Sequence, residues 1–179
     1  YTGLRWLRKS AEQGHVRAQH QLGLMRCDAE GLTQDIKACR HWLTTAAEQG
    51  YIFSQLMLAR RYREGRGLPG DMGQALYWYR RAADLGNAEA QVALGEAAQH
   101  GTGLTQNYAE AMQAYQRAAN QGYAEAFVHI GTLHEEGLGV PQNVKEAMLW
   151  YQRAAAAESA DAFFRIGALL ERHEGLQQQ

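Results

Sequence analysis

Residues 51–86 read YIFSQLMLARRYREGRGLPGDMGQALYWYRRAADLG, and the pattern of this stretch recurs along the chain. The stretch ends in a glycine that returns at a fixed step of 36 residues, at Gly14, Gly50, Gly86 and Gly122. The next step falls on Glu158. A constant period of this length is the signature of a repeat array, in which each unit buries its apolar face against its neighbours.

The first half of each unit has the spacing of a helix that another helix crosses closely. In residues 51–86 the apolar positions of one helical face are Ile52, Leu56, Ala59 and Tyr62. A large residue followed by a small one recurs in every unit, as Leu22-Gly23, Leu58-Ala59, Leu94-Gly95, Ile130-Gly131 and Ile166-Gly167. Glycine disfavours a helix by up to about 1 kcal/mol, and close packing of a neighbouring helix offsets this cost.

The second half of each unit starts with a capping signal and continues with an aromatic stripe. The predicted N-cap residues are Asp35, Asp71, Asn107 and Asn143. Three residues further on, capping boxes are predicted in the second to fourth units by Gln74, Glu110 and Glu146. Aromatic residues alternating with alanine then predict a core face. The recurring glycine lies where a helix ends in a left-handed residue, so we predict a strained turn at Glu158.

These signals predict an all-α fold of antiparallel helix pairs, with about 12 to 15 residues in each helix. We expect a single array over residues 1–179. Its parts are a half repeat at 1–14, four repeats at 15–50, 51–86, 87–122 and 123–158, and a half repeat with a tail at 159–179. Because Tyr1 falls inside the repeat pattern, we expect the chain to begin part-way through a unit.

The fourth unit carries a family resemblance through Ala126, Ile130-Gly131, Gly137-Leu138-Gly139-Val140, Asn143, Lys145-Glu146-Ala147, Trp150-Tyr151 and Ala154-Ala155. These columns resemble the Sel-1-like repeat family, a tetratricopeptide-type group. The resemblance implies a right-handed α-superhelix, a solenoid whose concave wall is lined by the first helix of each unit. It also implies work as an adaptor or scaffold in bacterial complexes, with a peptide or a partner domain bound along the groove.

The concave positions of the family predict a partner-binding face in this chain. These columns change character from unit to unit, whereas the core columns do not, as expected where packing does not fix the residue type. The predicted partner-binding residues are Phe53, Leu56, Met57, Arg60, Arg63, Glu96, Gln99, His129, Thr132 and Glu135. A variable polar column is equally the mark of a hydrated helix face, and this alternative stays open.

The one local concentration of charge is formed by Arg60, Arg61, Arg63 and Arg66. Arg60 and Arg63 share a helix face. With Arg66 in the next turn, they predict a site for an acidic segment or a C-terminal carboxylate. Salt bridges inside the array, to Glu64 or Glu96, are the alternative.

Catalytic, cofactor and metal motifs are weak, and we predict that the protein is not an enzyme. Residues 65–70, GRGLPG, match G-x-G-x-x-G, but that motif needs a preceding strand, and here the glycine pair recurs as a turn between helices. The densest group of metal-ligating residue types is His129, His134, Glu135 and Glu136. Histidines five residues apart do not share a helix face, so we expect no metal and no cofactor.

The two cysteines, Cys27 and Cys39, lie 12 residues apart on the two helices of one unit, so a bridge is conceivable. The cysteine-rich branch of the family instead bridges from the alanine pair to the following helix, and those columns contain no cysteine here. Cys39 occupies a column that is otherwise alanine, which favours a small buried thiol. We therefore expect two free thiols.

The charge balance limits the classes of partner. A formal net charge of −1 argues against nucleic acid and anionic membranes, although the first 90 residues are net basic and the remainder net acidic. No apolar run approaches the roughly 18 to 20 residues that span a bilayer.

The predicted function is that of a non-enzymatic protein-interaction scaffold for a peptide or a partner domain, with self-association through the end repeats as a further option. The alternative is an envelope-associated peptidoglycan-binding or β-lactam-binding protein or hydrolase, like the cysteine-rich branch of the family. A bacterial periplasm or envelope and a cytoplasmic location are both compatible with the sequence.

Overall fold

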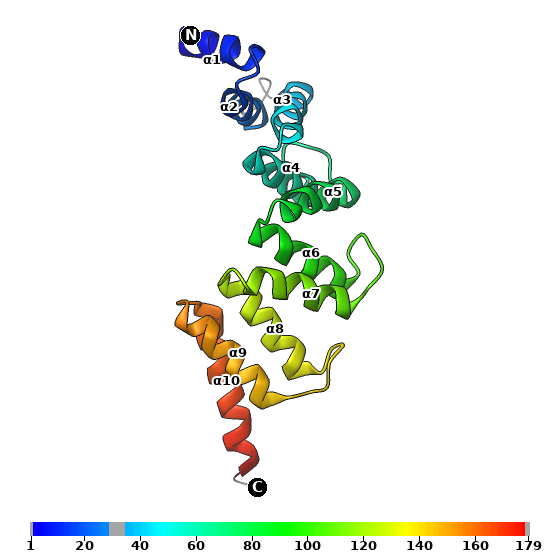
Figure 1. Ribbon diagram of the computed structural model, residues 1–179, viewed down its shortest axis with the longest axis vertical. Coiled ribbons are helices and arrows are strands. Elements are labelled where there is room, and N and C mark those ends of the chain that lie inside the picture. Colours follow the sequence, from blue (N-terminus) through cyan, green and yellow to red (C-terminus); the bar gives the residue numbers. More distant parts are fainter. Residues whose placement is uncertain (1, 29–34, 178–179) are drawn as a thin grey trace. The chain divides into compact units, whose positions relative to one another are not determined.

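The computed structural model describes residues 2–28 and 35–177, and all the regular structure in these ranges is helical (Figure 1). The chain divides into two compact units, Tyr1–Asn87 and Ala88–Gln179. The helices of the first unit are α1 (Thr2–Glu12), α2 (Val16–Cys27), α3 (Ile36–Glu48), α4 (Ile52–Glu64) and α5 (Met72–Asp84). Those of the second are α6 (Ala88–His100), α7 (Tyr108–Ala119), α8 (Ala124–Glu136), α9 (Val144–Ala156) and α10 (Ala160–Gln177).

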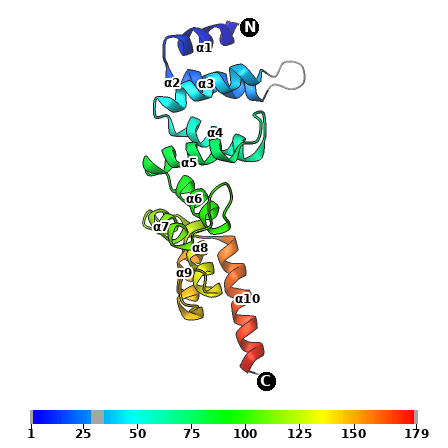
Figure 2. The ribbon, with the colours of Figure 1, turned by 90° about the vertical axis from the view of Figure 1, so that its right-hand side faces the viewer.

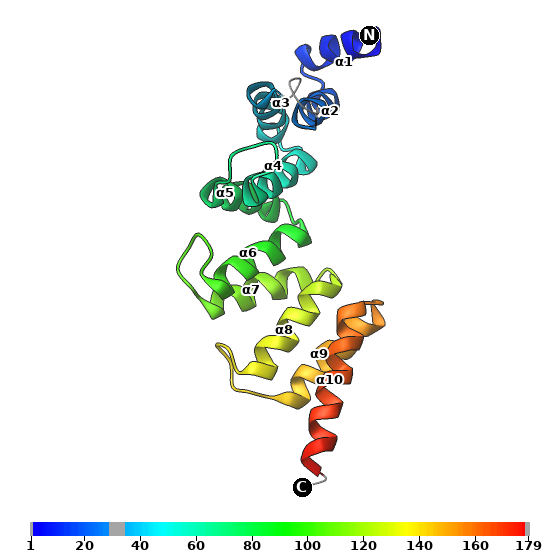
Figure 3. The same ribbon diagram turned by 180° about the vertical axis from the view of Figure 1, so that it is seen from behind.

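Within each unit, every helix packs against the next one along the chain (Figure 2 and Figure 3). The two helices of one repeat run antiparallel and are joined by a turn, as α6 and α7 or α8 and α9 show. The prediction of an all-α array of helix pairs is therefore confirmed. The turn between α2 and α3, residues 29–34, lies outside the described residues.

The predicted N-caps are confirmed, whereas the predicted capping boxes are wrong. Asp71 Oδ1 accepts a hydrogen bond from the backbone N–H of Gln74 at 3.0 Å, and Asp35, Asn107 and Asn143 cap their helices in the same way. A capping box also needs the N-cap N–H for the side chain three residues on. That N–H instead donates to a carbonyl of the preceding helix, from Asp71 to Tyr62, Asn107 to Ala98 and Asn143 to His134. The bond ties the turn to the first helix of the repeat.

The core explains why small residues follow large ones in the first helices. A Cβ added to Gly95 would lie 2.5 Å from Cε1 of Tyr115, and one added to Gly131 would lie 2.5 Å from Cε1 of Tyr151. Both tyrosines are fully buried. Glycine at these positions makes room for the ring of the second helix, which is the close crossing that the sequence predicts.

The turn after each second helix depends on a residue with positive φ. Gly14, Gly50, Gly86 and Gly122 have φ values between 77° and 90°. Glu158 occupies the same place with φ 60°, and it is the only non-glycine residue with positive φ in the described ranges. A side chain in this conformation meets its own carbonyl oxygen, at roughly 1–2 kcal/mol. The prediction of a strained turn at Glu158 is confirmed.

The two cysteines form a disulfide, so the prediction of two free thiols is wrong. Cys27 ends α2, Cys39 lies in the first turn of α3, and their Cα atoms are 4.9 Å apart. Because α2 and α3 pack as an antiparallel pair, the end of α2 lies beside the start of α3, within the distance that a disulfide spans. The cysteine-rich branch of the family forms its bridge at other positions, and that difference was therefore no evidence against a bridge between Cys27 and Cys39.

Candidate functional site

An open groove of about 800 Å³ lies in the second unit, between the first helices α6 and α8 and the start of α10. Each of these helices is the first of its repeat, and so they present equivalent faces to the groove. Its acidic side chains are Glu96, Glu125, Glu136, Glu158 and Asp161. Among the lining residues, all of them described, Arg165 alone is a lysine or arginine.

His129 lines the groove, and its ring contacts two neighbouring side chains. Its imidazole stacks flat on Tyr115 of α7, with ring centroids 4.6 Å apart and an interplanar angle of 4°. Nε2 lies 3.5 Å from a carboxylate oxygen of Glu96. Burial lowers the pKa of His129, and Glu96 opposes this shift only in part. The imidazole is therefore held mainly neutral at pH 7.

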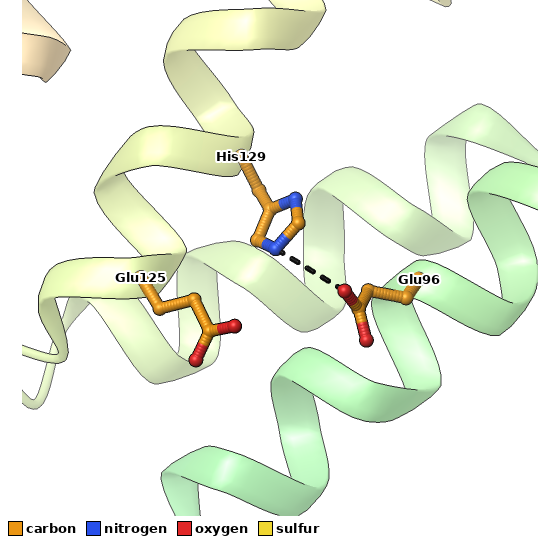
Figure 4. Close-up of side chains that lie close together, drawn as sticks. All are labelled: Glu96, Glu125 and His129. Atoms are coloured by element: carbon orange, nitrogen blue, oxygen red, sulfur yellow. Dashed lines mark ion pairs between the residues drawn. The ribbon is translucent and has the colours of Figure 1, made fainter. Parts of the chain in front are cut away.

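Glu125 completes a cluster around His129, which we call the 96/125/129 cluster. Glu125 and His129 are four residues apart on α8 and share a helix face, while Glu96 comes from α6 (Figure 4). One ligand atom from each of the three side chains lies within 4.8 Å of the other two. Figure 4 shows both carboxylates turned toward the same edge of the imidazole.

Four of the predicted partner-binding residues, Glu96, Gln99, His129 and Thr132, line this groove together. Gln99 and Thr132 are buried. The hydroxyl of Tyr115 donates to Gln99 Oε1 at 2.7 Å, and Thr132 Oγ1 donates to the carbonyl of Val128 at 3.1 Å. Their polar atoms therefore take part in internal hydrogen bonds at the floor of the groove.

Glu135, the fifth predicted residue of the second unit, is buried and is not a lining residue. Its carboxylate accepts hydrogen bonds from the Tyr151 hydroxyl and from Arg172 of α10. Burial raises the pKa of Tyr151, and the hydrogen bond to Glu135 raises it further, so this hydroxyl stays a donor. Gln99 and Glu135 belong to one sequence column, and each accepts from the core tyrosine of the following helix.

The predicted residues of the first unit all lie on α4. Phe53 is 64% exposed, Leu56 is buried, and Met57 and Arg60 are half-buried. Arg63 is exposed, and its guanidinium lies 5.6 Å from the centroid of the Tyr79 ring.

Salt bridges inside the repeat, left open as an alternative by the sequence, are present in the arginine cluster. Glu64 lies 3.8 Å from Arg63 and 3.6 Å from Arg66. Both pairs are exposed and contribute little to stability.

A second open groove, of about 830 Å³, lies in the first unit on the second helices, which the sequence reasoning did not single out. Lys37, Arg40 and His41 of α3 face it, together with Tyr77 and Trp78 of α5. The available signal was Tyr77, an aromatic residue beside the core column that stays 46% exposed. In the groove of the second unit, Glu125 belongs to a first-helix column but was not among the predicted partner-binding residues; its signal was its four-residue spacing from His129.

Comparison with known proteins gives a consistent family assignment. The model of the Sel1 repeat matches residues 2–15, 16–51, 52–87, 88–123 and 126–159. A protective antigen of uropathogenic Escherichia coli with an SLR fold is 33% identical, with a TM-score of 0.84 over 95% of this chain and 36% of that one. A Sel1 repeat protein from Oxalobacter formigenes is 30% identical, with a TM-score of 0.75 over 86% of this chain and 62% of that one. This chain thus spans less than two thirds of either relative.

A more distant likeness shows the fold alone. The cysteine-rich protein B of Helicobacter pylori is 20% identical, with a TM-score of 0.57 over 74% of this chain and 96% of that one. A search of the curated proteins found no match. In the described part of the chain, no helix combines the length and apolar character that crossing a membrane requires.

Proposed function

The chain belongs to the Sel1 repeat family, and from this premise we propose that it is a non-enzymatic scaffold that binds a basic, extended segment of a partner protein. Proteins of this family are generally protein-interaction scaffolds. The proposed site is the groove on α6, α8 and α10, with the acidic side chains of that groove as the groups that recognise the partner.

The observation that carries this proposal is the charge of the groove. Five carboxylates line it against one arginine, and Arg165 itself lies 3.8 Å from Asp161. Carboxylates on a concave surface attract lysine and arginine side chains over a distance of about one Debye length, near 10 Å at moderate salt. An extended segment suits an open groove along stacked first helices, because such a segment contacts each repeat in turn.

The exposed and half-buried residues of α4, Phe53, Met57, Arg60 and Arg63, remain proposed as contacts for a second, acidic segment. An apolar side chain that is largely exposed beside arginines supports this assignment, since aromatic residues and arginine are enriched where proteins bind one another.

Fluorescence anisotropy with labelled peptides tests the main proposal. Two peptides of about ten residues are compared in low salt with a chelator present, one rich in Lys and Arg and one of equal length rich in Asp and Glu. We expect micromolar binding of the basic peptide, tighter than the binding of the acidic peptide, and an affinity for the basic peptide that falls as salt is added.

Charge reversal locates the binding site. Glu136→Lys, at the C-terminal end of α8 where a cation suits the helix dipole, is expected to weaken binding by roughly fivefold. Glu171→Lys, on an exposed part of α10 outside the groove, is the matched control and should leave the affinity unchanged. Preference for the acidic peptide, or equal effects of the two variants, would contradict the proposal.

A further inference from the structure

The 96/125/129 cluster has the composition of a metal site with three protein ligands. Histidine nitrogen and glutamate oxygen are ordinary ligands of Zn²⁺, at about 2.0–2.2 Å, and an open zinc site keeps three protein ligands with water in the fourth position. Here Nε2 of His129 already approaches Glu96 at 3.5 Å, and the ligand atoms of all three residues lie within 4.8 Å of one another. Small rotations of the two glutamate side chains bring the oxygens to zinc distance.

The orientation of His129 distinguishes this cluster from a solvated group of acids. The ring is held by stacking on Tyr115, and its side chain is 21% exposed. The Nε2 edge of this ring faces the carboxylates of Glu96 and Glu125 (Figure 4). A metal-binding histidine needs this kind of restraint, because an ordered ligand loses less conformational freedom when the ion binds.

The two carboxylates of the cluster lie close to each other and to His129. Among the described residues, neither Glu96 nor Glu125 forms an ion pair with a lysine or arginine. Nε2 of His129, the ring nitrogen next to Glu96, offers a lone pair when the imidazole is neutral. A divalent cation among the three ligands therefore removes the repulsion between the two carboxylates and uses the lone pair of the neutral imidazole.

From this geometry we propose that Glu96, Glu125 and His129 bind one Zn²⁺ ion in the groove of the second unit, with solvent completing the coordination. The nitrogen ligand favours Zn²⁺ over Mg²⁺ and Ca²⁺, which prefer oxygen alone. The ion bridges α6 and α8, which belong to successive repeats.

Isothermal titration of the full chain with Zn²⁺ at pH 7.5, without chelator and without peptide, tests the site. We expect one ion per chain with a micromolar dissociation constant, and no comparable binding of Mg²⁺. His129→Gln and Glu125→Gln should each weaken binding by roughly tenfold or more, because each removes one of three ligands. The controls are His41→Gln, an exposed residue of α3, and Glu110→Gln, an exposed residue of α7. They remove the same residue types elsewhere and should change the affinity less than twofold.

Nuclear magnetic resonance of the unmodified chain makes the test independent of how the variants fold. On addition of Zn²⁺, the ring signals of His129 and the backbone signals around Glu96 and Glu125 should shift together and saturate at one equivalent. Absence of saturable binding below about 1 mM, or shifts centred on other histidines, would mean that the cluster is an ion pair only and would overturn the proposal. Because the assay contains no peptide, its failure leaves the peptide proposal untouched, and the peptide assay with chelator is equally independent of zinc.

Discussion

Alanine substitution in the small-residue column provides a test of the close crossing between α8 and α9. Gly131 faces the ring of Tyr151, and an added Cβ would lie 2.5 Å from Cε1 and 2.7 Å from Cδ1. Carbon atoms in contact prefer about 3.5–4.0 Å, so Gly131→Ala requires a shift of roughly 1 Å. Gly167 stands in the same column of α10, and a Cβ added there meets nothing within 4 Å.

The ring of Tyr151 has little freedom to move. It is fully buried, and its hydroxyl donates to Glu135 and lies 3.3 Å from Thr132 Oγ1. Overpacking of this kind costs about 1–3 kcal/mol, against a gain of about 1 kcal/mol from replacing glycine by alanine in a helix. Because the ring is held in place, we expect the upper part of this cost, about 2–3 kcal/mol, so Gly131→Ala should lower the free energy of unfolding by about 1–2 kcal/mol. Gly167→Ala should raise it by about 0.5–1 kcal/mol, because only the propensity gain remains.

Urea unfolding followed by circular dichroism, with hydrogen exchange of the α8 and α9 amides, measures both variants under identical conditions. The test is that the two changes in the free energy of unfolding have opposite signs, since both substitutions replace a glycine of the same column by alanine. If Gly131→Ala were as stable as the unmodified protein, or if both variants shifted in the same direction, the packing explanation of this column would be refuted.

The turns, the disulfide and the half-buried His20 each provide a further prediction. Glu158→Gly should raise the free energy of unfolding, measured in urea, by about 1 kcal/mol, because the relief of backbone strain outweighs the added freedom of the unfolded chain. Glu158→Ala keeps the strain and should leave the free energy of unfolding unchanged. Reduction of the Cys27–Cys39 bridge, which closes a separation of 12 residues, should lower the stability of the first unit by about 3 kcal/mol, seen as a lower thermal midpoint in dithiothreitol. Burial lowers the pKa of His20, so its contribution to stability is fully present above pH 6.5 and is lost as the pH falls through the lowered pKa. A ring titration by NMR should give a pKa below 6.5, and His20→Gln should flatten the loss of stability on acidification; a midpoint at or above 6.5 would contradict this.

Much of the fold could be predicted from the sequence because packing repeats with the period. The glycine column, the N-caps and the small residues each recur at one step, and several signals therefore agree on every boundary. The capping boxes failed for a tertiary reason, since the N–H of Asp71 bonds to Tyr62 of the preceding helix, a contact that residue spacing does not contain. The prediction of two free thiols was wrong for a similar reason, because the register of two antiparallel helices decides whether Cys27 reaches Cys39.

The candidate site was predictable only in outline. The first-helix columns predicted Glu96 and His129 as groove residues. The search for metal ligands, however, considered residues close together in the sequence, and it grouped His129 with His134. The ligand set closes across two repeats, with Glu96 contributed by α6. The burial of the predicted residues could not be predicted either. Periodicity does not reveal that the hydroxyl of Tyr115, a core residue, donates a hydrogen bond to Gln99.

The tyrosine hydroxyls have a consequence for how such arrays diversify. Tyr115 and Tyr151 extend from the interior to Gln99 and Glu135. A substitution at Gln99 removes the acceptor of a buried hydroxyl, and one at Glu135 leaves the Tyr151 hydroxyl with Thr132 at 3.3 Å, whereas a substitution at Glu125 or Glu136 removes no such acceptor. New specificities should thus arise at the rim, while acceptors below it change only together with their tyrosine. A combinatorial library built on this scaffold should randomise rim positions such as Glu125 and Glu136 and keep the acceptors Gln99 and Glu135 constant.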